Sequence, residues 1–366
     1  MAWTKTPNVA QFKGADWTNF IHKEPNCTPE MAKRIALKNP NITFFFFCRE
    51  YMVLEGPVLE KYGAFNPGDA VFFSGEPWYG SAPQCDAYQK NHMTIAYITP
   101  KNSQQFKDVG NYTLADGSPA IDVVCIFAGN YASADLPYLR AQNNQPPTQK
   151  PFNDNIQTAL DDGSVQYLQS KGITVLMTIL NGHAQVGWSE FTVTEPQAAQ
   201  DFAQYLKTEV VDKYGLDGID IDDEYSAGNA NNESLIMVTS FMQQLMPDKI
   251  ISKALFADEH YFQATWQGKK LADNLTYGWE MSYGGDPQDR LPLYVNVGMA
   301  KNKLSCGFLR DKDHPSYDPT PAVNWIVNNG YEGVMVDGFE SPANIELMGI
   351  LVNALYGPGN WNPPKG

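Results

Sequence analysis

The stretch "LDGIDIDDEY" (Leu216–Tyr225) places five carboxylates within ten residues and alternates several of them with isoleucine. Successive side chains of a β-strand point to opposite faces, so the acids at positions 220, 222 and 224 share one face and the two isoleucines share the other. A solvated acidic turn would not carry isoleucine at alternate positions, and an EF-hand loop needs its glycine and terminal glutamate at other offsets. We therefore interpret the stretch as a strand that points three carboxylates into the protein interior.

Seven further short apolar runs, rich in β-branched residues, predict strands elsewhere in the chain. They are Met93–Ile98, Ile121–Phe127, Ile173–Leu180, Lys249–Phe256, Leu275–Tyr283, Lys303–Leu309 and Gly333–Gly338. Amphipathic patterns typical of helices lie between several of these runs, at Asn155–Lys171, Pro196–Tyr214, Asn232–Met246 and Pro321–Asn329. Near-continuous apolar strands that alternate with helices indicate a parallel sheet covered by helices.

Eight such strands favour a closed (β/α)₈ TIM barrel over an open doubly wound sheet, and no GxGxxG motif follows the first strand. No full helix is evident between the first two strands. We therefore expect an α/β fold, a TIM barrel in which some helices are short or missing.

Residues 1–92 do not follow this alternation. Thr28–Asn39 has the pattern of a capped helix, and two apolar runs at 42–56 and 69–80 predict strands around the turn "FNPGD". We interpret residues 1–92 as a helix-and-hairpin extension packed on the barrel, and residues 93–366 as the catalytic barrel.

A barrel fold determines where the acidic side chains of this strand would point. Its isoleucines would meet the helices, and its acids would line the lumen and rise toward the carboxyl-terminal face. Neighbouring interior carboxylates repel one another and lose hydration, so at least one should hold a proton near neutral pH. Folding does not require such an arrangement, and a catalytic role is therefore predicted ahead of a structural or metal-binding one.

The composition limits the classes of ligand. A formal net charge of −15 argues against nucleic acid and anionic membranes, because phosphate binding needs concentrated Lys and Arg. No run of 18 apolar residues is present, so no membrane span is predicted. An aromatic content of 13% fits a protein that offers ring faces to sugars, although aromatic residues are also ordinary core residues.

The five cysteines, at positions 27, 48, 85, 125 and 306, show no CxxC spacing. Neither a zinc site nor a full disulfide framework is indicated. Three of them fall before residue 90, where one disulfide and free buried thiols both stay open as interpretations.

The segment "LDGIDIDDE" fits the DGxDxDxE signature of family-eighteen glycoside hydrolases, and "DDEY" resembles the endoglycosidase H group rather than chitinases. Further segments look like parts of such endo-β-N-acetylglucosaminidases in the right order: Val109–Gly117, Asp122–Asn130, Val175–Trp188, Met246–Ser252 and Tyr277–Gly284. The resemblance covers roughly residues 93–357. The first 90 residues lie outside it.

The resemblance implies roles for four residues. Glu224 matches the acid that protonates the departing glycosidic oxygen, and Asp222 matches the neighbour that orients the 2-acetamido group of the substrate. The sugar's own carbonyl oxygen then attacks C1 and forms an oxazolinium intermediate, which is an exception to the two-carboxylate scheme. Asp220 would share the proton of Asp222, while Tyr283 corresponds to a tyrosine whose hydroxyl contacts the acetamido group.

Six further residues are candidates for substrate binding because of their places in the resembling segments or at strand ends. They are Asn130, His183, Tyr225, Trp279, Glu280 and Phe339. The resemblance implies that the substrate is the chitobiose core of N-glycans, on glycoproteins, and that no metal or organic cofactor takes part. A chitinase and an inactive carbohydrate-binding barrel are the alternatives. We expect a monomer, and the resemblance favours secretion although the chain shows no signal peptide at Met1.

Overall fold

The computed structural model describes most of the chain. The described residues are 3–11, 18–53, 63–77, 79–130, 152–180, 188–223, 231–283, 286–315 and 317–364. Across these ranges, none of the helices has both the length and the apolar character that crossing a bilayer demands.

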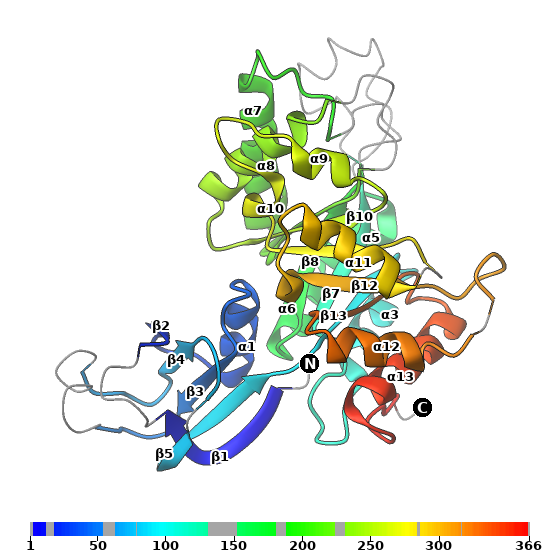
Figure 1. Ribbon diagram of the computed structural model, residues 1–366. Helices are drawn as coiled ribbons and strands as arrows, with labels where there is room; N and C mark the ends of the chain where they lie inside the picture. The colour runs from blue at the N-terminus through cyan, green and yellow to red at the C-terminus, as the bar shows by residue number, and fades with distance from the viewer. Residues whose placement is uncertain are drawn as a thin grey trace.

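A closed barrel of eight parallel strands forms the centre of the molecule (Figure 1). Its strands are β6 (Met93–Ile98), β7 (Val123–Gly129), β8 (Thr174–Ile179), β9 (Gly218–Ile221), β10 (Ile250–Leu255), β11 (Tyr277–Glu280), β12 (Leu304–Phe308) and β13 (Gly333–Val336). They follow one another around the barrel in chain order, and β13 closes on β6. The predicted TIM barrel, with each of its eight strands, is therefore confirmed.

Helices cover the outside of the barrel. In chain order they are α3 (Ser103–Asp108), η1 (Val109–Asn111), α5 (Asp154–Asp161), α6 (Ser164–Ser170), α7 (Gln197–Tyr205), η3 (Leu206–Asp212), α8 (Ser234–Leu245), α9 (Glu259–Gln263), α10 (Leu271–Asn274), α11 (Pro287–Asn296), η4 (Lys301–Lys303), α12 (Thr320–Asn328) and α13 (Pro342–Tyr356). As expected, only the short α3 and η1 lie between the first two barrel strands.

Two details of the predicted helices are wrong. The single helix expected at Asn155–Lys171 is divided into α5 and α6, because Gly163 adopts the left-handed conformation with φ 82°. Helices α11 and α13 were also not predicted from the sequence. Pro292 lies inside α11, and α13 is apolar over most of its surface, so neither shows a clear amphipathic pattern.

Side chains of the barrel strands alternate between two cores. Tyr97, Leu176 and Trp279 belong to the cluster that fills the lumen. Ile219 and Ile221 belong to the cluster between the strands and the helices. The acidic strand is thus oriented as its period-two pattern predicted.

The N-terminal region is larger than the predicted hairpin. It comprises β1 (Trp3–Gln11), β2 (Phe20–Glu24), α1 (Pro29–Leu37), β3 (Phe44–Cys48), β4 (Ala70–Phe73) and β5 (Tyr79–Lys90), and its antiparallel sheet has the order β1-β5-β3-β4-β2. The expected pairing of β3 with β4 is present, but β1, β2 and β5 were missed. Strands β1 and β5 mix polar residues with Pro7 and Pro83, and β2 has only five residues, three of them polar, which weakens the strand signal.

The N-terminal sheet and α1 close the amino-terminal end of the barrel, at the lower left of Figure 1. Arg34 of α1 forms an ion pair with Asp217 just before β9, at 2.5 Å. The hydroxyl of Tyr277, at the start of β11, donates to the carbonyl of Leu37 at 2.8 Å. One apolar cluster runs from the sheet into the lumen. The N-terminal region therefore packs against the amino-terminal end of the barrel.

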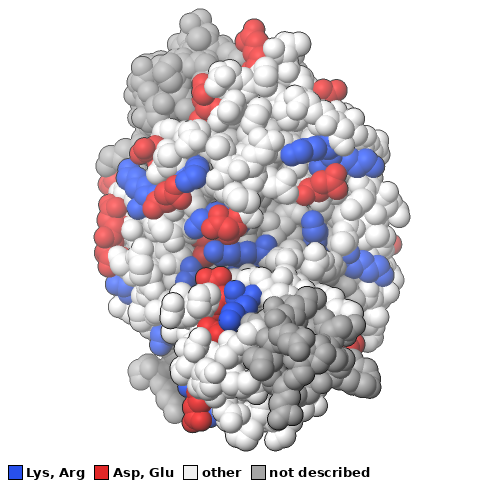
Figure 2. Space-filling model, turned by 90° about the vertical axis from the view of Figure 1, so that its left-hand side faces the viewer, with Lys and Arg blue, Asp and Glu red and all other residues white. Residues whose placement is uncertain are grey.

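The surface of this side carries charges of both signs. Figure 2 shows basic and acidic side chains interspersed over the face that includes the junction of the sheet and the barrel. A cavity of about 500 Å³ lies in this junction, between Lys90, Asn302 and Glu332, at the end of the barrel away from the acidic strand's carboxyl terminus.

Candidate functional site

Asp220 lies at the centre of the lumen, fully buried, and accepts four hydrogen bonds. Its Oδ1 accepts from Ser252 Oγ at 2.7 Å and from Trp279 Nε1 at 3.0 Å. Its Oδ2 accepts from the hydroxyl of Tyr97 at 2.6 Å and from Thr178 Oγ1 at 2.9 Å. The four donors come from four strands, β10, β11, β6 and β8, so the closed barrel itself assembles this carboxylate's environment.

Two opposing effects act on the pKa of Asp220. Burial raises this pKa, because water no longer solvates the charge, and the four hydrogen bonds lower it by favouring the carboxylate. The net direction is upward. Asp220 therefore gains a proton more readily than a solvated aspartate, while its geometry is fixed by donors on both oxygens.

Asp222 follows two residues later, at the carboxyl end of β9, and is also buried. Its backbone N–H donates to the carbonyl of Ile179 at 3.2 Å, which extends the β8–β9 ladder by one step. The charges of Asp220 and Asp222 together raise the pKa of Tyr97, in addition to burial, which is the larger cause. The electrostatic effects of both carboxylates therefore reach the same side chain, Tyr97, in the lumen.

Asp217, the first acid of the stretch, is structural. Asp217 lies at the opposite end of β9, where Oδ2 accepts from Gln169 Nε2 at 3.0 Å and from the Val175 N–H at 3.0 Å. Together with the ion pair to Arg34, these contacts tie the barrel to α1. Asp217 therefore lies away from the carboxyl-terminal end.

A cavity of about 590 Å³ opens at the carboxyl-terminal end of the barrel beside β9, β10 and β11. Its volume falls in the range of small-molecule sites. Lining residues include Asp223, Phe256, Tyr261, Met281, Tyr283 and His314. Phe256 is 58% exposed, so an apolar ring faces solvent at the edge of this cavity.

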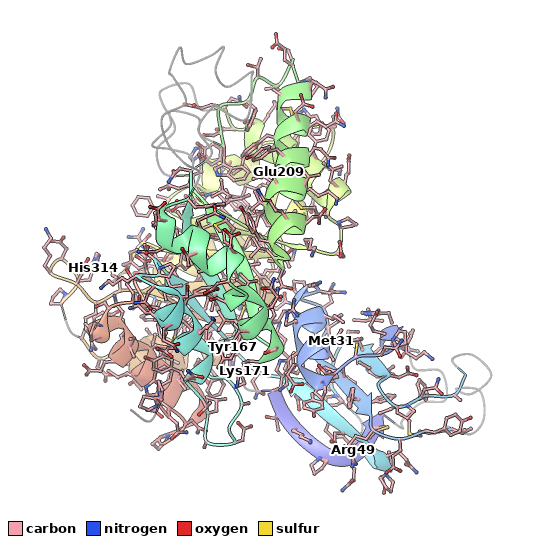
Figure 3. All side chains as sticks on the ribbon, turned by 180° about the vertical axis from the view of Figure 1, so that it is seen from behind. Met31, Arg49, Tyr167, Lys171, Glu209 and His314 are labelled. Atoms are coloured by element: carbon pink, nitrogen blue, oxygen red, sulfur yellow. The ribbon has the colours of Figure 1, made fainter. Side chains whose placement is uncertain are left out.

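Tyr283 lies in this cavity wall after β11 and is half-buried. Its backbone is in the left-handed region, with φ 34°. The ring meets that of His314 edge to face at 5.9 Å, and His314 lies on a loop that projects from the barrel (Figure 3). Tyr283 and Asp223, which lies two residues after β9, line the same cavity.

Trp279 and Glu280, adjacent in the sequence, point to opposite sides of β11. Trp279 is completely buried in the lumen, stacked on Tyr277 at 5.3 Å, and donates to Asp220. Glu280 faces outward and accepts from the N–H and the hydroxyl of Ser282, which orders the turn that leads to Tyr283. Burial raises the pKa of Glu280.

Phe339 lies after β13 in the apolar layer between strands and helices and is 2% exposed. Its ring meets Tyr112 at 5.4 Å, and Tyr112 stacks on Trp361 at 4.9 Å. Asn130 follows β7 and is partly exposed. Its Oδ1 atom is buried and has no hydrogen-bond partner among the described residues.

Three predicted site residues, Glu224, Tyr225 and His183, lie outside the described residues. Glu224 follows Asp223 directly, so its place in the chain is one residue beyond the described end of the acidic stretch.

Sequence reasoning missed a charged cluster on the outer side of β10. Lys253 is 2% exposed and forms an ion pair with Asp258 at 2.5 Å, and Tyr294 donates to the same carboxylate at 2.8 Å. Burial acts to lower the pKa of Lys253, but the carboxylates of Asp258 and Asp223 outweigh this effect and raise it. A lysine inside the apolar strand "IISKAL" was the available signal.

Comparison with known proteins places this chain in a family. A family model described as the TIM-barrel domain of the endo-β-N-acetylglucosaminidase EndoS matches residues 100–296. An endo-β-N-acetylglucosaminidase from Flavobacterium sp. (strain SK1022) is 30% identical over 292 residues, which are 75% of this chain and 84% of that protein. The chain belongs to the endo-β-N-acetylglucosaminidase family. The predicted resemblance to these family-eighteen glycoside hydrolases is confirmed.

Two other proteins are similar to this enzyme. Endo-β-N-acetylglucosaminidase F1 from Elizabethkingia meningoseptica is 26% identical over 267 residues, 68% of this chain and 73% of that protein. The structure of EndoBT-3987 from Bacteroides thetaiotamicron in complex with a Man9GlcNAc2Asn substrate has a TM-score of 0.58 at 18% identity, and covers 88% of this chain and 91% of that one. Because the identity to EndoBT-3987 is only 18%, this similarity shows a shared fold and no more.

Proposed function

We propose that this enzyme hydrolyses the β-1,4 bond between the two core GlcNAc residues of N-linked glycans. The observation that carries the proposal is the carboxyl end of β9, where Asp220 and Asp222 are buried in succession, with Asp222 two residues before Glu224 in the sequence. The name printed for the Flavobacterium relative and the Man9GlcNAc2Asn substrate printed for the Bacteroides structure support this substrate class.

The acids divide the reaction between them. Glu224 protonates the glycosidic oxygen, and Asp222 holds the N–H of the 2-acetamido group so that its carbonyl oxygen attacks C1. The oxazolinium intermediate is then opened by water with Glu224 as the base, and the configuration is retained. Because the nucleophile comes from the substrate, one strand supplies both acids.

Asp220 supports this pair from below. Its four donors hold it in one orientation, and its raised pKa makes it a partner for the proton of Asp222 when the acetamido group arrives. Tyr283 contacts the acetamido group from the cavity wall. Asn130, whose buried Oδ1 has no partner among the residues that the structure describes, accepts a hydrogen bond from a sugar hydroxyl.

Three of the expected substrate contacts take other roles in this proposal. Trp279 positions Asp220, and Glu280 positions the turn before Tyr283. Phe339 packs in the outer core, since it is 2% exposed and its ring contacts that of Tyr112. His183 and Tyr225 keep the sugar-binding roles that the sequence resemblance implies.

The test compares two substrates. Incubation with Man9GlcNAc2-Asn, followed by mass spectrometry, should release a glycan that ends in one GlcNAc and leave GlcNAc on asparagine, while chitin oligomers stay intact. Cleavage of the chitin oligomers alone would make the enzyme a chitinase. Binding without cleavage of either would make it a carbohydrate-binding barrel.

The role of Glu224 is tested with Glu224→Gln, which should lower turnover by about 10²-fold or more without changing the melting temperature. Glu233→Gln is the matched control, because Glu233 is exposed at the start of α8 and should leave turnover unchanged. Turnover retained by Glu224→Gln would remove Glu224 from the mechanism.

A further inference from the structure

Two cysteines of the N-terminal sheet face each other across neighbouring strands. Cys48 on β3 is directly opposite Cys85 on β5 in the antiparallel register. Both side chains are completely buried, and their sulfur atoms lie 3.1 Å apart. Met52 adds a third sulfur at 3.5 Å from Cys85 Sγ, so the surroundings are apolar.

The backbone geometry at this pair suits a covalent bond. The N–H of Arg49 donates to the carbonyl of Gln84 at 2.7 Å, whereas the N–H and carbonyl of Cys48 pair with Asp69 and Gly68 on the other side. Cys48 and Cys85 are therefore a non-hydrogen-bonded pair, in which opposite Cα atoms lie about 4.5 Å apart. This separation falls within the range of about 4.4 to 6.8 Å found in disulfides.

We propose that Cys48 and Cys85 form a disulfide that closes the N-terminal sheet when the chain folds in the presence of a disulfide oxidant such as oxidised glutathione. One thiolate attacks the oxidant and releases a first glutathione thiolate, and the second cysteine then displaces the other. The two protein thiols are oxidised, two glutathione thiols are formed, and the protein loses two hydrogen atoms.

The bond has to form before the sheet is fully packed. The hydrogen bond to Cys85, together with burial, raises the pKa of the Cys48 thiol, so little thiolate is present in the folded protein. Both sulfurs are also inaccessible to an oxidant once β3 and β5 have paired. The reaction therefore belongs to folding, when the strands are still open.

The disulfide joins β3 to β5 within the N-terminal sheet. It closes a loop between positions 37 residues apart that contains β4. A loop of this length restricts the unfolded chain strongly, so the oxidised protein should be more stable. Arg49, next to Cys48, lies on the sheet well away from the barrel in Figure 3, so turnover should not depend on the bond.

The other cysteines provide internal controls. Cys27 is buried beside α1, and burial raises the pKa of its thiol to about 11. Cys125 faces the lumen and Cys306 the outer core of the barrel. All three should stay as thiols.

The experiment refolds the full chain from denaturant with reduced and oxidised glutathione, alkylates the remaining thiols, and maps the peptides by mass spectrometry without reduction. A Cys48–Cys85 linked peptide and a protein lighter by about 2 Da before alkylation are expected, with the other three cysteines alkylated. Alkylation of both Cys48 and Cys85, or a bond from Cys27 to either of them, would overturn the proposal.

Thermal unfolding provides a second readout. The oxidised wild type should melt about 5 °C above the reduced protein. A Cys85→Ala variant should show no such difference, whereas the matched Cys27→Ala variant should show the full shift. An equal shift in Cys85→Ala would mean that the oxidant acts elsewhere.

Discussion

Replacement of Lys253 by methionine should destabilise the enzyme far more than loss of an ordinary lysine. Lys253 and Asp258 are 2% and 9% exposed at their side chains and lie 2.5 Å apart. Removal of one partner of a buried pair leaves an uncompensated charge and costs about 3 to 5 kcal/mol. Tyr294 still donates to Asp258, which places the expected cost near 3 kcal/mol rather than at the upper end.

Urea unfolding at pH 7 measures this cost. Lys213→Met is the matched control, because Lys213 and Glu209 are about half-exposed and 3.9 Å apart, and such pairs contribute about 0 to 1 kcal/mol. The double variant Lys253→Met with Asp258→Asn should recover most of the loss, since it leaves no buried charge unpaired. A loss below about 1 kcal/mol for Lys253→Met would refute the reasoning.

The pH dependence of this pair has a defined sign. The pKa of Lys253 is raised in the folded state, so the pair stabilises the protein fully below the ordinary lysine pKa of 10.5. Its contribution is lost as the pH rises through the raised value. The difference in unfolding free energy between wild type and Lys253→Met should therefore become smaller only in strongly alkaline solution.

Two other predictions concern the pKa values of buried carboxyl groups. Trp279→Phe removes one of the donors that lower the pKa of Asp220, so the pKa of Asp220 should rise further. We expect kcat to fall while the KM for a glycopeptide changes little. An unchanged pH–rate profile would contradict this expectation. Burial raises the pKa of Glu332 from 4.5 to about 7, so the folded protein holds a proton that the unfolded chain releases, and stability should fall as the pH rises between these values. Glu332→Gln should flatten this dependence in melting temperatures measured from pH 4.5 to 7.

Much of the barrel is predictable from local sequence. Each barrel strand is a short apolar run, and period-two alternation fixes which face of β9 carries its acids, because side-chain direction depends only on the backbone of that strand. The family resemblance likewise needs only the order of residues. The sequence did not predict the division into two helices at Gly163, because a single residue in a left-handed conformation gives a weak local signal. Strands β1 and β5 were not predicted either, because their sequences are polar.

The environment of each acid was decided by the tertiary structure. Tyr97 and Asp220 are 123 residues apart, and nothing in either segment predicts their contact. Closure of the barrel brings β6 across the lumen to β9 and gives Asp220 four donors from four strands. The same holds for Cys48 and Cys85, whose register depends on pairing between β3 and β5. The sequence alone determined which side chains point inward, and packing of distant strands determined what those side chains meet there.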